Sequence, residues 1–206
     1  MTTNVISLDP NDVRADHPFS HPDYSRRDGE VMRDMIGQVG EGLEPSREAS
    51  LYRQDPADEG WQYRLIVPNA DVLRQRREFE VVGFFGQRQT DTDADPRLLD
   101  ALDDILIAEL PTHPGIVCYF SKALGSGDYC NLVLFVDRAA KELWATSEAY
   151  AFATRRLAPE HYASVRIHNG WLRQGLANPD MFVMTCSKYF AYRPGFWQAL
   201  RRYENR

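Results

Sequence analysis

The chain has 206 residues and a formal net charge of −6, with 43% hydrophobic and 26% charged residues. This length suits one domain with a substantial core. The acidic balance argues against a nucleic-acid partner, which normally needs a basic surface to replace phosphate counterions. We find neither a long apolar run nor a charged-then-apolar leader, so we predict no membrane span or secretory signal and expect a cytoplasmic protein.

Residues 1–60 are predicted to form an N-terminal arm that is extended or partly disordered and carries a short helix. Met1–Asp28 is polar and contains three Xaa-Pro pairs, which favour extended chain. Apolar residues recur at helical spacing in Arg27–Val39 and predict a short amphipathic helix on the exterior. Glu41–Gly60 is acidic with Gly and Pro signals, which is typical of a loop or linker.

Residues 61–206 are predicted to form a single domain. Trp61–Pro68 has the composition of a strand, and a short helix is predicted around Asp71–Arg77. This helix brings three arginines close together in the sequence, namely Arg74, Arg76 and Arg77. Such a cluster is either a solvated face or, if the side chains converge, an anion site.

The core of this domain, residues 80–171, is predicted to have the element order β-α-β-β-α-β. Helices are indicated by apolar residues at three- and four-residue spacing, and strands by short β-branched and aromatic runs. The elements are Glu80–Gln89, Pro96–Glu109, Gly115–Lys122, Tyr129–Val136, Arg138–Leu157 and Ala163–Trp171. This order is the ferredoxin-like pattern, so we predict an α+β fold with an antiparallel sheet.

Beyond the core, a C-terminal extension is predicted to contain one strand and one helix. Met181–Tyr192 alternates well enough for a strand. Gly195–Tyr203 is predicted to be a helix with an apolar stripe of Phe196, Trp197, Leu200 and Tyr203.

Alternation along the predicted strands separates an apolar face from a more polar one. We expect the apolar face to pack on the two helices. The other face carries apolar residues that an open sheet would expose, so something must cover it. Its side chains are expected to converge on one cavity, and they are Val117, Tyr119, Ser121, Asn131, Val133, Phe135, Arg166 and His168.

This cavity is the predicted site. His168 is the candidate general base because the pKa of an imidazole lies near neutrality, while Tyr119 and Arg166 could hold an oxyanion. The candidate substrate-binding residues are Ser121, Asn131, Trp144 and Phe135. The alternative is that His168 and Arg166 only satisfy their neighbours at a dimer interface, and that Trp144 is a packing aromatic.

The segment Trp144–Tyr150, which follows the predicted strand NLVLFVD, has the pattern Trp-x-x-Ser-Glu-x-aromatic. It resembles the dimeric α/β-barrel superfamily, which includes antibiotic-biosynthesis and haem-degrading monooxygenases. The resemblance covers Glu80–Trp171 and implies a homodimer in which two sheets pack face to face. In the haem-degrading branch a His ten residues after this Trp ligates the iron, but Thr154 stands there in this chain, which argues against ordinary haem degradation.

The resemblance implies a monooxygenase-like or cyclase/isomerase-like enzyme acting on an aromatic or polyketide-like small molecule. Such oxygenases can work without a metal, so no cofactor is expected, while haem and flavin stay open as alternatives. The competing hypothesis is a non-catalytic dimeric ligand-binding or scaffold protein. No metal site is predicted, because Cys118, Cys130 and Cys186 lack metal-ligand spacing and are expected to be reduced and buried.

Overall fold

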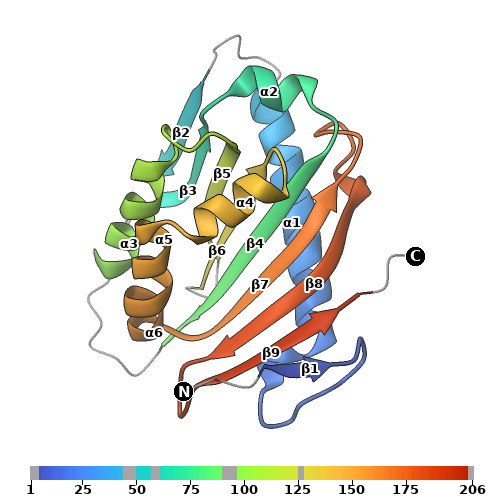
Figure 1. The fold of residues 1–206 in the computed structure, drawn as a ribbon, viewed down its shortest axis with the longest axis vertical. Coiled ribbons are helices and arrows are strands. Elements are labelled where there is room, and N and C mark those ends of the chain that lie inside the picture. The colour runs from blue at the N-terminus through green and yellow to red at the C-terminus, as the bar shows by residue number, and fades with distance from the viewer. Residues whose placement is uncertain (1–4, 44–49, 57–60, 90–96, 125–127, 204–206) are drawn as a thin grey trace.

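The computed structural model describes residues 5–43, 50–56, 61–89, 97–124 and 128–203. A nine-stranded sheet with the order β1-β9-β8-β7-β4-β6-β5-β3-β2 forms its centre (Figure 1). The strands are β1 (Ile6–Leu8), β2 (Leu51–Pro56), β3 (Trp61–Val67), β4 (Phe79–Arg88), β5 (Ile116–Ala123), β6 (Tyr129–Phe135), β7 (Tyr162–Leu172), β8 (Phe182–Ala191) and β9 (Trp197–Arg202). The sheet is mixed because β1 pairs with β9 in parallel, whereas β4 and its neighbours are antiparallel.

Helices cover both faces of this sheet. Helix α1 lies behind it in Figure 1, and α3 to α6 lie in front of its β4, β6 and β5 side. The helices are α1 (Pro22–Leu43), α2 (Ala70–Gln75), α3 (Arg97–Glu109), α4 (Arg138–Ala145), α5 (Glu148–Phe152) and α6 (Ala158–His161). The fold is therefore α+β, as predicted. In the described part of the chain, no helix is long and apolar enough to span a membrane.

The predicted β-α-β-β-α-β order of the core is confirmed. Helix α3 connects β4 to β5, and the helical stretch from α4 to α6 connects β6 to β7. The four strands stand side by side as β7-β4-β6-β5 and are antiparallel throughout. The strand ends differ from the predicted ones by one residue or so, which is the usual uncertainty of such boundaries.

The predicted helix Arg138–Leu157 is divided. Helix α4 ends at Ala145, and Ser147 caps α5 by accepting a hydrogen bond from the Tyr150 amide at 3.1 Å. Ser and Thr hydroxyls compete for backbone groups in this way and favour helix ends over interiors. Residues Ala153–Leu157 then form a π-helical turn before α6.

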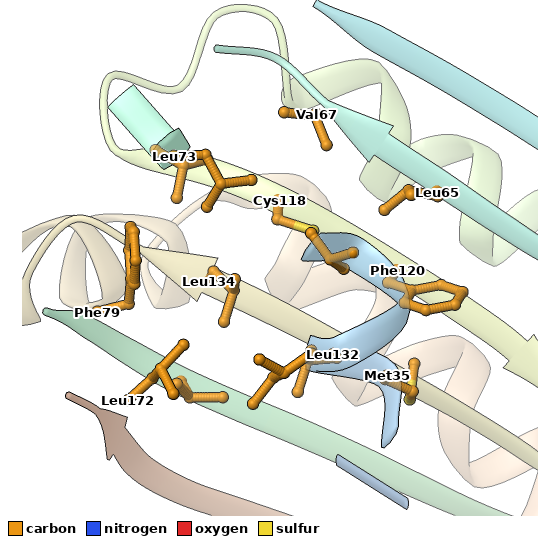
Figure 2. Close-up of a cluster of buried hydrophobic side chains, with 14 of the residues drawn as sticks. Met35, Leu65, Val67, Leu73, Phe79, Cys118, Phe120, Leu132, Leu134 and Leu172 are labelled. Carbon is orange, nitrogen blue, oxygen red and sulfur yellow. The ribbon is translucent and has the colours of Figure 1, made fainter. Parts of the chain in front are cut away.

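Helix α1 is longer and more deeply buried than predicted. Its residues Met32, Met35, Ile36 and Val39 are fully buried and pack on the sheet. Figure 2 shows Met35 in this cluster with Phe120 and Leu132. The close approach depends on Gly83 of β4, since a Cβ there would lie 2.6 Å from the Met32 sulfur.

Two expectations about the N-terminal region are therefore wrong. The strand face that was expected to meet a partner's sheet, which carries Tyr119, Asn131 and Phe135, packs against α3 to α5 of the same chain, and the opposite face is covered by α1. Residues 1–60 are also more than an arm, because they supply α1 to the core, β1 to the β9 edge and β2 to the β3 edge. The stretch Glu41–Gly60, predicted to be a loop, contains the end of α1 and strand β2.

The predicted C-terminal helix Gly195–Tyr203 is wrong, since these residues contain strand β9. The inward face of β9 includes Ala199 and Arg201, both buried. The strand alternation was not recognised in the sequence because an arginine is not expected at a buried position of a strand. The hydrogen bonds of Arg201 satisfy the buried charge, since it donates to the Asp9, Ser20 and Asp12 carbonyls and to the Tyr189 hydroxyl.

Candidate functional site

The residues predicted to share a cavity lie on opposite faces of the sheet. Leu132 of β6 pairs with Gly83 of β4, which pairs in turn with His168 of β7. Directly paired residues point to the same face, so His168 faces α1 together with Leu132. Asn131 precedes Leu132 and faces the other way. The predicted convergence is wrong: Arg166 and His168 lie on the α1 side, and Tyr119, Ser121, Asn131, Phe135 and Trp144 lie on the side of α3 to α5.

The error comes from register. Polarity shows which residues of one strand share a face, but it does not align that strand with its neighbour, and a one-residue slip exchanges the faces. Matching polar with polar placed His168 beside Asn131. In the structure, the residue aligned with Asn131 across β4 is Ile167.

On the side of α3, the predicted residues belong to a closed polar cluster around Asp103. Its carboxylate accepts hydrogen bonds from the hydroxyls of Tyr119 at 2.6 Å and Tyr129 at 2.7 Å. It also accepts one from the Arg64 guanidinium at 3.0 Å. Burial raises the pKa of Asp103 more than these hydrogen bonds and Arg64 lower it. Burial also raises the pKa of Tyr119 well above its ordinary value, so its hydroxyl stays a hydrogen-bond donor.

The sequence contained one signal for this cluster. Asp103 lies three residues before Leu106 and seven before Leu110, which places a carboxylate on the apolar stripe of α3. Leu106 and Leu110 are buried, and Asp103 is fully buried with them. Ser121 and Asn131 complete the cluster: the Ser121 hydroxyl donates to Asp103 at 3.4 Å, and the Asn131 amide donates to the Tyr119 hydroxyl at 3.3 Å.

On the α1 side, His168 and Arg166 both contact Asp28 of α1. Asp28 Oδ2 lies 2.8 Å from His168 Nε2 and 2.5 Å from Arg166 Nε, and its Oδ1 accepts from the same guanidinium at 3.0 Å. Burial alone would raise the pKa of Asp28, but the hydrogen bonds from His168 and Arg166 outweigh it and lower the pKa. Burial lowers the pKa of His168. The hydrogen bond and the charge of Asp28 raise this pKa, but by less than burial lowers it.

The other nitrogen of His168, Nδ1, lies 2.6 Å from the Ser187 hydroxyl. Asp28, His168 and Ser187 are thus linked in the order found in nucleophilic hydrolase sites. However, His168 and Ser187 are both 0% exposed, and the Ser187 hydroxyl is also bonded to Tyr203 at 2.8 Å. Among the described residues this serine is thus closed off from solvent, and the hydrogen bonds fasten α1 to β7 and β8.

A groove of about 530 Å³ lies on the sheet face opposite α1, between α4 and the strands β7 to β9. In Figure 1 no helix lies in front of β8 and β9. A row of directly paired residues crosses four strands and forms part of the floor: Val82, Asn169, Cys186 and Arg202. Trp144 and Tyr150 come from the helical side.

Three residues of this groove carry buried polar atoms with no hydrogen-bond partner among the described residues. They are Glu80 Oε2, Trp144 Nε1 and Asn169 Nδ2. These atoms are covered, and their neighbours include Lys141 and Tyr150. The Lys141 ammonium contacts Glu80 and lies 3.4 Å from Asn169 Oδ1, while the Tyr150 ring lies 5.2 Å from that of Trp144.

The groove continues into an apolar hollow of about 570 Å³. The two hollows share Tyr150, Ile167 and Phe190, so together they form one elongated site with a polar and an apolar half. The rest of the apolar half includes Phe84, Val165, Tyr192 and Phe196. An apolar hollow beside a polar one suits a small molecule with an apolar body and a polar head.

Cations outnumber anions around the polar half. Lys141 is paired with Glu80, and Arg138 is paired with Glu142 at 2.7 Å. Lys188 and Arg202 also line the groove and form no ion pair with any residue that the structure describes. The polar half therefore favours a ligand with negative or electron-rich oxygen.

Of the predicted site residues, Trp144 lines the groove. The Phe135 ring packs against the Trp144 ring, with 5.5 Å between their centroids. Thr154 lines the apolar half. Cys118 and Cys130 are buried as predicted, but Cys186 is only half-buried. Among the described residues, no group of three His, Cys, Asp or Glu side chains could hold a metal ion.

No protein-family profile and no curated protein matches the sequence. Among solved structures, the chain is similar to protein SO0527 from Shewanella oneidensis, with 16% identity and a TM-score of 0.36. The match covers 47% of this chain and 95% of that one. A likeness at this level carries no argument about fold or function.

Proposed function

We propose that this chain binds a small amphiphilic molecule in the groove beside Trp144. The observation that carries the proposal is the set of orphaned polar atoms on Glu80, Trp144 and Asn169, all three residues lining one hollow. A buried polar group without a partner costs about 1–3 kcal/mol, and three of the nine such atoms among the described residues belong to residues that line this one groove, which supports a ligand that pairs with them.

The types of these atoms indicate the polar head of the ligand. The Trp144 indole N–H and the Asn169 amide N–H are donors, so they require acceptors such as a carbonyl or carboxylate oxygen. The Glu80 carboxylate oxygen requires a donor such as a hydroxyl. A hydroxyl close to a carbonyl or carboxylate satisfies all three, and the cations Lys188 and Arg202 favour the anionic form.

The apolar half indicates the body of the ligand. Phe84, Tyr150 and Phe190 come from different elements and line the same hollow, where a flat ring system can pack against aromatic side chains. A planar aromatic or polyketide-like compound with a hydroxyl beside its carbonyl fits both halves. The same ligand class is implied by the resemblance to the dimeric α/β-barrel superfamily.

Calorimetric titration with 1-hydroxy-2-naphthoate tests the proposal, since this probe combines a flat body with the required hydroxyl and carboxylate. Trp144→Phe keeps a ring and removes the donor, so we expect affinity to fall about tenfold. Trp197→Phe is the matched control, because Trp197 Nε1 is also buried without a partner but does not line the groove. Equal affinities of the two variants, or no binding to the natural chain, would refute the proposal.

The hydroxyl can be tested separately with 2-naphthoate, which lacks it. If Glu80 accepts a hydrogen bond from that hydroxyl, removing the hydroxyl weakens binding to the natural chain but has little further effect once Glu80 is changed to Gln. Such non-additivity is the signature of a direct contact. Additive losses would show that Glu80 and the hydroxyl do not interact.

Oxygenation of the bound compound is a second candidate, because Trp144 and Tyr150 of the motif that resembles monooxygenases both line the groove. Against it, the predicted catalytic residues His168, Tyr119 and Arg166 lie outside the groove. Binding without turnover therefore has the stronger support. Aerobic incubation with 1-hydroxy-2-naphthoate followed by mass spectrometry decides the matter: an oxygenated product that disappears in Trp144→Phe favours the enzyme.

The ferredoxin-like identity of the core also belongs to the proposal. It is supported by the strand order β7-β4-β6-β5 and by the connection of these strands through α3 and α4 to α6. A barrel closed by a partner's sheet is not proposed, because α3 to α5 cover one face of β4, β5 and β6 and α1 covers the other. A homodimer stays a prediction, and it would need a surface other than the one beneath α1.

A further inference from the structure

The three arginines noted in the sequence around α2 all line one pocket on a different part of the surface. This arginine pocket has a volume of about 530 Å³ and lies between α1, α2 and the turn 174–177. Its lining includes Arg74, Arg76 and Arg77 from one side and Gly175 from the turn. We propose that the arginine pocket binds a multivalent oxyanion, namely a phosphate or pyrophosphate group.

Charge is the first argument. Arg76 and Arg77 form no ion pair with any residue in the described part of the chain. Arg74 is held by Asp71 of the same helix at 3.1 Å. The one acidic residue that lines the pocket is Glu41, so cations exceed anions here although the chain as a whole carries −6. Guanidinium groups on a concave surface suit phosphate because they combine charge with several aligned N–H donors.

Hydrogen bonds also hold the pocket walls in place. The Arg76 Nε donates to the Glu78 carbonyl at 2.9 Å, which restrains this guanidinium and leaves its other N–H groups for a ligand. The Gly175 amide donates to the Arg77 carbonyl at 2.8 Å. Gly175 has a φ of +76°, and a Cβ there would lie 3.2 Å from the Arg76 carbonyl oxygen, so glycine permits this close approach. The turn and the arginine segment are thus joined.

Helix α1 provides the opposite wall of the pocket through Gly37 and Gly40. Neither glycine has a side chain that could fill the hollow, and the opposite side packs closely here, since an added Cβ would lie 3.6 Å from Leu176 at Gly40 and 3.7 Å from Pro179 at Gly37. The same wall also limits where an anion can lie. Glu41 and the carbonyl end of α1 repel negative charge, so the oxyanion is expected near Arg76, Arg77 and the turn.

The experiment is calorimetric titration of the full chain with inorganic pyrophosphate at low ionic strength. Replacing Arg76 and Arg77 together by Gln should weaken binding by at least about tenfold, since each loses a charge-assisted hydrogen bond. Glu41→Gln should tighten binding severalfold because it removes the opposing charge. Arg27→Gln is the control: Arg27 is exposed near the other end of α1, about 15 Å along the helix from Gly37 at 1.5 Å per residue.

Two results would overturn the proposal. One is a lack of pyrophosphate binding by the natural chain. The other is an equal loss of affinity in Arg27→Gln, which would show that only net charge matters. All four substituted residues lie on the surface, and unchanged thermal unfolding midpoints verify that the variants are folded. A parallel titration with ADP identifies the source: if the phosphate group is what the pocket recognises, ADP loses affinity in the double variant to the same degree as pyrophosphate.

Discussion

The buried clusters around Asp28 and Asp103 differ from the groove beside Trp144 in one respect that separates structure from function. In the two clusters, the carboxylates accept hydrogen bonds from His168 and Arg166 or from Tyr119, Tyr129 and Arg64. In the groove, Glu80, Trp144 and Asn169 each keep an atom without a partner. The hydrogen-bonded carboxylates of the clusters hold the chain together, whereas the three unsatisfied atoms of the groove residues can bind another molecule.

This difference inverts the most natural interpretation of the sequence. His168, Tyr119 and Arg166 have the side chains of catalysts, yet each is engaged in a cluster that links elements of the fold. The predictions below test whether the clusters determine stability and the groove determines binding.

Asp28→Ala should destabilise the chain most. It leaves Arg166 without its carboxylate and His168 without a partner at Nε2, and breaking a buried ion pair from one side costs about 3–5 kcal/mol. Chemical denaturation measures this loss. The control is Asp34→Ala on the same helix, whose side chain is exposed and whose nearest cation, Lys122, lies at 3.8 Å. If the two variants lose equal stability, the Asp28 cluster does not fasten α1.

Acidification should weaken the Asp28 cluster on the α1 side of the sheet. Because the pKa of His168 is lowered in the folded chain, the unfolded chain takes up a proton more readily below about pH 6.5, and stability falls as pH decreases. Asp28 acts in the same direction at lower pH, since its pKa is also lowered. His168→Gln should reduce the slope of stability against pH between about 6.5 and 5. An unchanged slope would show that His168 does not contribute to it.

The Asp103 cluster should respond in the opposite sense. The pKa of Asp103 is raised by burial, so its contribution to stability is fully present below the unfolded value of about 3.9 and is lost as pH rises through the folded value. The two sides of the sheet therefore differ in the sign of their pH dependence as well as in their contacts.

Much of the fold could be predicted because its signals are local. Apolar spacing and turn residues gave the order from β4 to β7, including the hairpin of β5 and β6. The failures involve distant partners. Whether Arg201 can lie in a strand depends on carbonyls near the N-terminus, and whether α1 can cover the sheet depends on Gly83 admitting Met32. Neither contact has a signature in its own segment.

The site was less predictable for the same reason. Trp144 was identified from its motif, but the groove also needs Asn169, Cys186 and Arg202, which become neighbours only through the registers of three strand pairs. Asp28 lay where the predicted extended segment Met1–Asp28 overlaps the predicted exterior helix Arg27–Val39, so nothing in the sequence placed it beside His168. The sequence shows where the polar residues are, but it does not show which of them find hydrogen-bond partners in the folded chain.

Tyr119→Phe should reduce stability moderately, and it tests whether this predicted catalytic residue has a structural role. It removes the hydroxyl that donates to Asp103 at 2.6 Å and leaves the ring in place, so we expect a loss of about 1–2 kcal/mol. Binding of 1-hydroxy-2-naphthoate should be unchanged, because Tyr119 does not line the groove. If the variant is folded but no longer binds the naphthoate, Tyr119 contributes to ligand binding and the prediction is wrong.

Asn169→Leu should have the smallest effect on stability and the opposite sign. The Asn169 amide nitrogen is buried without a partner, and its oxygen has one long contact, to Lys141 at 3.4 Å. An apolar side chain of similar size removes the unsatisfied donor and gains contact with the apolar floor, so the free energy of unfolding should rise by up to about 1 kcal/mol. Binding of the naphthoate should fall at the same time. A variant that gains stability and loses its ligand would show that the groove is maintained at a cost to the fold, which a purely structural residue would not impose. If Asn169→Leu is instead destabilised, then Asn169 is satisfied in solution, and the groove loses one of the three atoms on which its assignment depends.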